Sequence, residues 1–303
     1  MKHSDVMTPK EIRDFSVTND LSALRVFAFN WLSIVSLFAV VAVWTNPITI
    51  FLAIVLMGGR QLGLSVLVHE CGHGNLFTKW RVNRFTGQWL AAAFVFSNAK
   101  RYRIGHGKHH RKGGTHDDPD LANYASYAVS RTSFRRKILR DLTGRTGVKT
   151  LYYSAKALGP KNVAIWIVAN GLLWGCLYAT GHGVVYLLWP VSWLTTFMLY
   201  SRVRNASEHG AVPDLFDPDP RKHTRTTHAR WWERMTVAPN CVNYHLEHHI
   251  LSSVPCYRLK AFHRFLLAKG VLNEAEICHG YGEVIRRLIK SGDSDTPSAE
   301  VTA

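Results

Sequence analysis

Residues 26–59 read VFAFNWLSIVSLFAVVAVWTNPITIFLAIVLMGG and contain no Asp, Glu, Lys or Arg. A helix rises about 1.5 Å per residue, so a bilayer core of about 30 Å needs roughly 20 apolar residues for each crossing. This stretch is long enough for two crossings, and the turn-forming residues TNP lie near its middle, at 45–47. The pattern predicts two membrane-spanning helices, over residues 27–45 and 48–68.

A second stretch without these charged residues covers 162–201 and carries GHG near its middle, at 181–183. By the same argument it predicts a second hairpin, with spans at 163–180 and 184–201. Helices in the core of a soluble protein rarely run this long without a charged face, which argues against buried core helices. The predicted fold class is therefore all-α and integral to the membrane, with four spanning helices in two hairpins.

All 37 Lys and Arg residues lie outside the two uncharged stretches. Two hairpins place the segments before, between and after them on one side of the membrane, and the excess of Lys and Arg marks that side as cytoplasmic. We expect a cytoplasmic segment (1–25), a membrane domain (26–290) with a helical cytoplasmic cap (69–161 and 202–290), and a disordered tail (291–303).

The net charge of +16 raises the question of nucleic acid as a partner. The sequence contains no recognised nucleic-acid motif, and attraction to anionic lipid headgroups explains the basicity more simply. Arg60 needs a separate explanation, because an Arg at the bilayer centre costs at least about 3 kcal/mol on insertion scales. Either its helix is displaced toward the headgroups, or Arg60 faces a cavity lined by protein.

Nine of the sixteen histidines fall in four short motifs. These are HECGH at 69–73, HGKHH at 106–110, NASEH at 205–209 and HLEHH at 245–249. Residues three or four apart share one face of a helix, so the polar side chains of each motif project together. All four motifs lie on the predicted cytoplasmic side, where we expect them to converge just outside the bilayer.

Clustered imidazolium groups repel one another, whereas neutral imidazole is the commonest metal ligand in proteins. The motifs therefore predict a metal site. Zinc takes three or four protein ligands, so nine histidines exceed one zinc site and suit two metals of higher coordination number. Imidazole binds Fe, Cu, Ni or Zn, so spacing alone leaves the metal open. The isolated histidines are interpreted as solvated or hydrogen-bonded residues: His3, His116, His182, His223, His228, His263 and His279.

Two other classes of protein are compatible with part of this pattern. HECGH matches the H-E-x-x-H motif, in which two histidines bind zinc and the glutamate is a general base, so an intramembrane zinc protease is one alternative. It needs one further ligand and leaves both HxxHH triplets without a role. The other alternative is a non-catalytic metal-binding or transport protein.

The motifs HECGH, HGKHH and NYHLEHH resemble the three histidine boxes of the integral-membrane fatty acid desaturase and hydroxylase superfamily. The resemblance extends to HHRKGGTHDDPDL after the second box and VPCYRL after the third, and it covers roughly residues 60–259. It implies two iron ions, O2 as the oxidant and a four-helix membrane domain below a cytoplasmic catalytic cap. Three residues separate the histidines of the first box, as in acyl-lipid desaturases.

Carried over box by box, the resemblance implies a set of metal ligands: His69, His73, His106, His109, His110, His245, His248 and His249. Asn205 and His209 resemble an additional Asn/His pair of acyl-CoA desaturases, in which the Asn binds through water. Five carboxylates are candidates to accept hydrogen bonds from the ligand imidazoles: Glu70, Asp117, Asp118, Glu208 and Glu247.

The predicted function is that of a membrane-bound, oxygen-dependent desaturase acting on a long acyl or related lipid chain. The alternative within the superfamily is a hydroxylase or ketolase of lipids or carotenoids. The chain has no fused haem domain and no cysteine set for an iron–sulfur cluster, so a separate ferredoxin or cytochrome is expected to supply electrons. The expected location is a bacterial inner membrane, with the endoplasmic reticulum as the alternative.

Overall fold

The computed structural model describes residues 3–290, so the predicted disordered tail (291–303) lies outside the described residues. Four helical segments are long and apolar enough to span a membrane, which confirms the predicted number for the described part of the chain. These segments are α3 (Asp20–Val43), α4 (Pro47–His73), α9 (Pro160–Ala179) and the run Gly183–His209, which comprises η3 (Gly183–Leu187), α10 (Leu188–Ser192), η4 (Trp193–Phe197) and α11 (Met198–His209).

The remaining elements are short helices and one small parallel sheet. The helices are α1 (His3–Val6), α2 (Pro9–Ser16), α5 (Trp80–Gly87), η1 (Gln88–Ala92), α6 (Ala99–Lys112), η2 (Leu121–Asn123), α7 (Arg131–Leu142), α8 (Arg145–Leu158), α12 (Pro220–His223), α13 (Trp231–Met235), η5 (Pro239–Cys241), α14 (His245–Ile250), η6 (Cys256–Arg258), α15 (Leu259–Ala268) and α16 (Tyr281–Leu288). Strand β1 (Thr226–Thr227) pairs with β2 (Ile277–Cys278).

The turn between α3 and α4 forms where the residues TNP predict it. The Asn46 side chain accepts hydrogen bonds from the backbone N–H groups of Ile48 and Thr49, at 3.0 and 3.1 Å. Pro47 occupies the first turn of α4, where a missing N–H costs nothing. The cap residue and the proline together start the second helix at this point.

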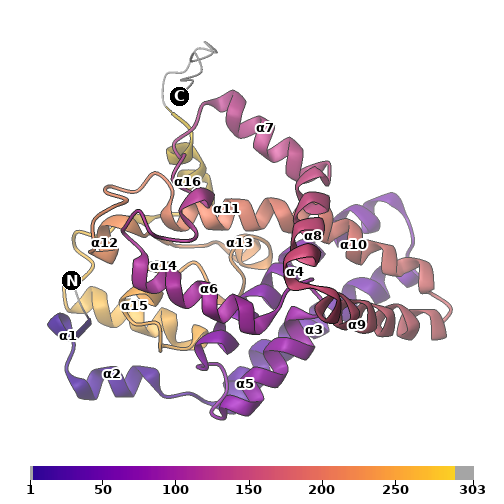
Figure 1. Ribbon diagram of the computed structural model, residues 1–303, viewed down its shortest axis with the longest axis horizontal. Helices are drawn as coiled ribbons and strands as arrows, with labels where there is room; N and C mark the ends of the chain where they lie inside the picture. Colours follow the sequence, from indigo (N-terminus) through magenta and orange to yellow (C-terminus); the bar gives the residue numbers. More distant parts are fainter. Residues whose placement is uncertain (1–2, 291–303) are drawn as a thin grey trace.

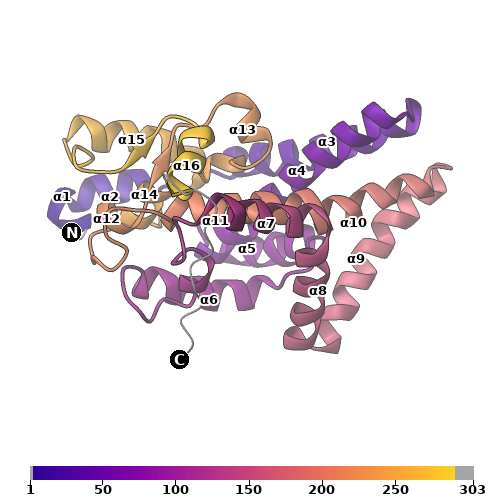
Figure 2. The same cartoon turned by 90° about the horizontal axis from the view of Figure 1, so that it is seen from above.

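The long helices extend from one side of the molecule (Figures 1 and 2). Figure 2 shows the pair α3 and α4 and the pair α9 and α10 projecting away from α12, α14 and α15. Helix α4 packs closely against both α3 and the end of α13, because glycines face them. A Cβ atom on Gly63 would lie 2.0 Å from Asn30 Oδ1, and one on Gly59 would lie 2.2 Å from the Met235 carbonyl oxygen.

Two of the long helices continue past the ends of the predicted spans, at 68 and 201. Helix α4 ends at His73 and α11 ends at His209, so both carry their histidine motifs without a break. Each predicted span ends where the apolar pattern of its stretch ends. The helices continue because surrounding elements bury their polar residues, including Glu70 at 1% and Glu208 at 5% exposure.

Candidate metal centre

Four helices that are distant in sequence supply the histidines of the predicted site. Helix α4 carries the first motif, α6 the second, α11 the Asn/His pair and α14 the third. The i, i+3 and i+4 spacing places the rings of each motif toward one region, as helical geometry predicts. All nine predicted histidine ligands lie in two neighbouring groups, in each of which one ring nitrogen per residue lies within 4.8 Å of the others: His69, His73, His106, His110 and His248 in the first, and His109, His209, His245 and His249 in the second.

The groups do not follow the motifs. The second motif contributes His106 and His110 to the first group and His109 to the second, while the third motif contributes His248 to the first and His245 and His249 to the second. Adjacent histidines therefore belong to different groups, as His109 and His110 do. Each group is assembled from at least three helices.

In the first group, the Nε2 atom of His248 lies 2.9 Å from the Nε2 atoms of His69 and His110. The Nε2 atoms of His110 and His106 are also 2.9 Å apart. Two nitrogens that each lie about 2.1 Å from one metal ion, at a right angle, are separated by about 3 Å. His73 Nε2 is buried and has no hydrogen-bond partner within the described chain. The donor set and this orphaned nitrogen fit a bound metal ion.

In the second group, His245 Nε2 lies 2.8 Å from His209 Nε2, and His109 Nε2 lies 3.3 Å from His249 Nε2. These spacings resemble those of the first group. Four imidazoles and a neighbouring cavity leave room for further small ligands on a second ion.

Burial favours the neutral form of five ligand imidazoles on the short helices α6 and α14. It lowers the pKa of His106, His245, His248 and His249 well below the ordinary value, and nearby imidazoles lower it further. Burial also lowers the pKa of His110 to about 2. A neutral ring has a free lone pair, so these residues are available as ligands at neutral pH.

Three of the five predicted carboxylates contact ligand imidazoles. His69 Nδ1 lies 2.9 Å from Glu70 Oε1, and the other Glu70 oxygen accepts a hydrogen bond from the Cys256 N–H at 2.8 Å. His245 Nδ1 lies 3.4 Å from Glu208 Oε1. A carboxylate on Nδ1 fixes the ring and its tautomer, so that Nε2 is directed to the metal.

Asp118 orients His109 in the same way, at 2.9 Å from Nδ1. The Tyr124 hydroxyl donates a hydrogen bond to the same carboxylate. Burial opposes the negative charge of Asp118, but the hydrogen bonds from His109 and Tyr124 outweigh it and lower the pKa to about 2. Asp118 is therefore ionised throughout the physiological range.

The prediction is wrong for Asp117 and Glu247. Asp117 pairs with Lys112, the last residue of α6, at the surface, at 3.0 Å. Glu247 lies on the face of α14 opposite the ligands, and it accepts hydrogen bonds from His263 Nδ1 and Thr226 Oγ1, both at 2.5 Å. Neither carboxylate contacts a ligand histidine.

Sequence reasoning also missed two orienting groups. The backbone carbonyl of His223 lies 2.9 Å from His209 Nδ1. Every residue has a backbone carbonyl, so no sequence pattern could have identified this contact. Arg204 donates a hydrogen bond to Glu208 at 2.6 Å and so holds the carboxylate beside His245. The spacing of Arg204 and Glu208 at i, i+4 on a helix is the signal that identifies this pair.

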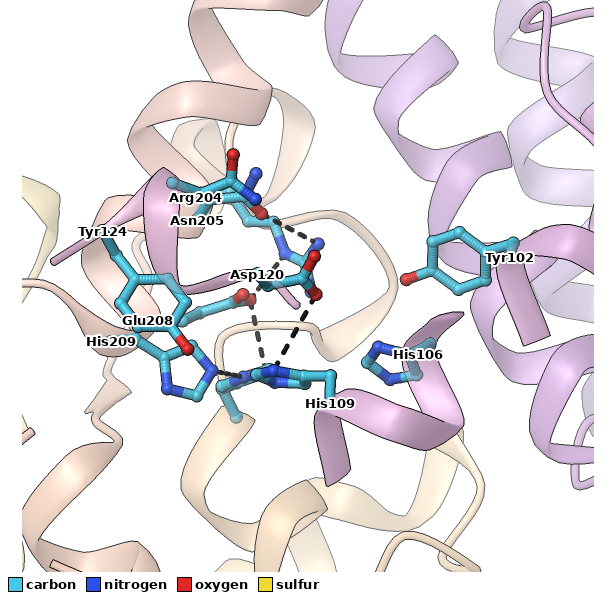
Figure 3. A pocket seen from close by; sticks show the side chains of 11 residues that line it. Tyr102, His106, His109, Asp120, Tyr124, Arg204, Asn205, Glu208 and His209 are labelled. Atoms are coloured by element: carbon cyan, nitrogen blue, oxygen red, sulfur yellow. Dashed lines mark hydrogen bonds and ion pairs between the residues drawn. The ribbon is translucent and has the colours of Figure 1, made fainter. Parts of the chain in front are cut away.

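A polar cavity of about 170 Å³ adjoins the second group (Figure 3). Its lining residues are Tyr102, His106, His109, Asp120, Asn123, Tyr124, Arg204, Asn205, Glu208, His209 and His245. Asn205 accepts a hydrogen bond from Arg204 at 3.3 Å and belongs to neither histidine group, so its binding through water stays a prediction. The cavity is smaller than the 300 Å³ or more of ordinary ligand pockets, and it suits water or another small molecule.

Four long apolar helices beside two buried histidine groups define a membrane protein with a candidate two-metal site. The chain belongs to the fatty acid desaturase family, whose model matches residues 42–277. It is 27% identical over 240 residues to the dihydrorhizobitoxine desaturase of Bradyrhizobium elkanii, a match that covers 71% of this chain and 66% of that protein. It is 24% identical over 213 residues to the beta-carotene ketolase of Paracoccus sp. (strain N81106 / MBIC 01143), which covers 66% of this chain and 73% of the ketolase.

Proposed function

We propose that the two histidine groups bind two iron ions and that the chain is an oxygen-dependent desaturase of the acyl-lipid type. It would introduce a C=C bond into a long acyl or related lipid chain. The observation that carries the proposal is the pair of adjacent groups, with five and four histidines, in a chain of the desaturase family. Bound iron would supply the O2-dependent removal of hydrogen from an unactivated C–H bond.

The protein's own residues would hold and shield the metals. Burial keeps His106, His245, His248 and His249 neutral. Glu70 and Asp118 hold the rings of His69 and His109 from the Nδ1 side, and Glu208 lies 3.4 Å from His245 Nδ1. His245 and His248 are only 2% and 3% exposed. Burial of this kind excludes bulk water, which strengthens electrostatic interactions and limits side reactions.

A hydroxylase or ketolase is the second candidate, because the chain also matches a beta-carotene ketolase. The same ligands would serve both reactions. Removal of a second hydrogen gives an alkene, whereas transfer of an oxygen atom to the carbon gives an alcohol or a ketone.

Two observations argue against the zinc protease. His69 and His73 of HECGH belong to a group of five histidines, more than a zinc ion uses. Both oxygens of Glu70 are occupied, one by His69 and the other by the Cys256 N–H, so Glu70 is not free to act as a general base.

The placement in the membrane is part of the proposal. The two pairs of long helices would form two hairpins, with the histidine groups and the basic segments on the cytoplasmic face of a bacterial inner membrane or of the endoplasmic reticulum. A separate ferredoxin or cytochrome would supply electrons, and its acidic surface would be attracted to the basic cap.

The test is to measure metals and products together. The protein is expressed in a host that lacks desaturases, and lipids are extracted and analysed by mass spectrometry. Purified protein is expected to contain about two irons per chain, and the host lipids are expected to gain a C=C bond. A new alcohol or ketone would favour the second candidate instead. One zinc per chain that remains after both HxxHH triplets are replaced by alanine would overturn the proposal.

A further inference from the structure

A second cavity, of about 440 Å³, lies between α3, α4 and the α13–η5 segment. It is lined by Arg25, Val26, Phe29, Arg60, Trp231, Arg234, Met235, Ala238, Asn240, Cys241, Cys256 and Tyr257. Six of the twelve side chains are aliphatic or aromatic, and three are arginines. None is an Asp or Glu. The cavity is therefore apolar with a concentration of positive charge.

Arg60 is the buried charge in this cavity, with 1% of its surface exposed. One Nη atom donates a hydrogen bond to the Arg234 carbonyl oxygen at 2.8 Å, and the guanidinium carbon lies 5.4 Å from the centre of the Phe29 ring. The buried Nε atom has no hydrogen-bond partner within the described chain. A guanidinium group has five N–H donors, and a buried donor without a partner is unfavourable. The Nε–H group of Arg60 is therefore a buried donor that no described residue satisfies.

The charge of Arg60 is also uncompensated. Among residues 3–290, no salt bridge joins a carboxylate to Arg60, Arg25 or Arg234. A buried ion is strongly unfavourable unless it has a partner of opposite charge. A ligand with one negative charge would supply that partner.

The backbone holds Arg60 in this position. Gly59, the preceding residue, contacts the Met235 carbonyl so closely that a Cβ atom would lie 2.2 Å from it. This contact brings the Arg234–Met235 backbone onto α4, where the Arg234 carbonyl anchors the guanidinium. Arg60 therefore faces a cavity lined by protein, which is one of the two arrangements that the sequence left open.

The surroundings of the cavity suit an amphiphile. Trp231 and Trp232 on α13 are 73% and 46% exposed, and exposed tryptophans are enriched at membrane–water interfaces. The lining includes Cys256, whose N–H donates to the carboxylate of Glu70, the residue that orients His69. Cys256 and Glu70 therefore connect the wall of the cavity to His69 of the first histidine group.

We propose that this cavity binds a fatty acid or another single-chain amphiphile with a carboxylate, and that Arg60 is the residue that recognises the acid group. The planar guanidinium matches a carboxylate geometrically and forms stronger hydrogen bonds to it than to a neutral group. A volume of about 440 Å³ suits one chain rather than a two-chain phospholipid. The apolar chain packs against Phe29 and Met235.

Equilibrium binding of radiolabelled palmitic acid tests this site. The metal-loaded full chain is placed in nanodiscs of zwitterionic lipid, without an electron donor, and hexadecanol serves as the uncharged probe of equal length. Palmitate is expected to bind saturably and about tenfold to a hundredfold more tightly than hexadecanol, as hydrogen bonds to a charged group predict. Arg60→Gln removes the charge and is expected to abolish this preference.

Arg81→Gln is the matched control, because Arg81 lines a different basic pocket beside α5, and it is expected to keep the preference for the acid. A second measurement needs no change at Arg60. Cys176 is exposed and is replaced by Ser, so that it does not react with the reagent. In this background palmitate, but not hexadecanol, is expected to slow the reaction of Cys241 with a maleimide. Equal binding of acid and alcohol, or an acid preference that persists in Arg60→Gln, would overturn the proposal. Competition by phosphatidic acid as strong as that by palmitate would overturn the single-chain assignment.

The proposed binding site and the proposed desaturase activity can be refuted independently. The binding assay contains no electron donor and requires no turnover. A protein that binds palmitate through Arg60 and forms no alkene, alcohol or ketone would refute the proposed function alone, and a desaturase without acid preference would refute this site alone.

Discussion

His69 and His248 are 179 positions apart in the sequence, yet their Nε2 atoms are separated by 2.9 Å. This contact joins α4, the most buried of the long helices, to α14 in the C-terminal half of the chain. It places residues of the first and third histidine motifs in one group.

His248→Ala should remove a predicted metal ligand that contacts His69 of the first motif and His110 of the second. Metal content should fall and product formation should drop by more than about 100-fold, since loss of a supporting group alone typically costs 10–100-fold. Elemental analysis and lipid profiling measure the two effects. His182→Ala, at an exposed turn, is the control and should behave like the wild type. Undiminished turnover in His248→Ala would refute the assignment of the third motif.

Asp118→Asn should reduce metal affinity or activity by about 10–100-fold, because the amide no longer provides the negative charge beside His109. The neighbouring Asp117→Asn is a matched control: it makes the same chemical change at a carboxylate that pairs only with Lys112 at the surface, so its effect should be negligible. Equal losses in both variants would show that Asp118 does not act through His109. Metal titration of the apoprotein is the measurement.

Gly59→Ala should destabilise the protein by about 1–3 kcal/mol, because the new methyl group overlaps the Met235 carbonyl and separates α4 from the end of α13. Gly171→Ala on α9 is the control. No atom lies within 4 Å of a Cβ placed at Gly171, and Ala favours helix more than Gly, so this variant should be neutral or slightly more stable. Thermal unfolding in detergent compares them, and a Gly59→Ala protein as stable as Gly171→Ala would contradict the close contact.

The proposed membrane orientation places the turn after α9 and the α7–α8 region on opposite sides. In a Cys176→Ser background, a membrane-impermeant maleimide added to intact cells should label His182→Cys and should not label Arg140→Cys until the cells are opened. Both positions are exposed in the structure, so accessibility within the protein is matched. Labelling of Arg140→Cys in intact cells would reverse the orientation.

Much of the fold could be predicted because local sequence patterns determine it. The absence of charge over 26–59 and 162–201 specifies long apolar helices, and Asn46 and Pro47 specify the turn between the first two. The helix ends at His73 and His209 could not be located this way. They depend on burial by other elements, which extends each helix past its apolar segment.

The candidate ligands were also readable from the sequence, since i, i+3 and i+4 spacing puts each motif on one helical face. The chain by itself therefore determined which histidines are available. Only the tertiary structure decided their partition, with His109 in one group and His110 in the other, and the buried position of Arg60 in a cavity without a carboxylate. The reason is physical: spacing along a helix orients neighbouring side chains, whereas a shared site depends on which helices pack together across the fold.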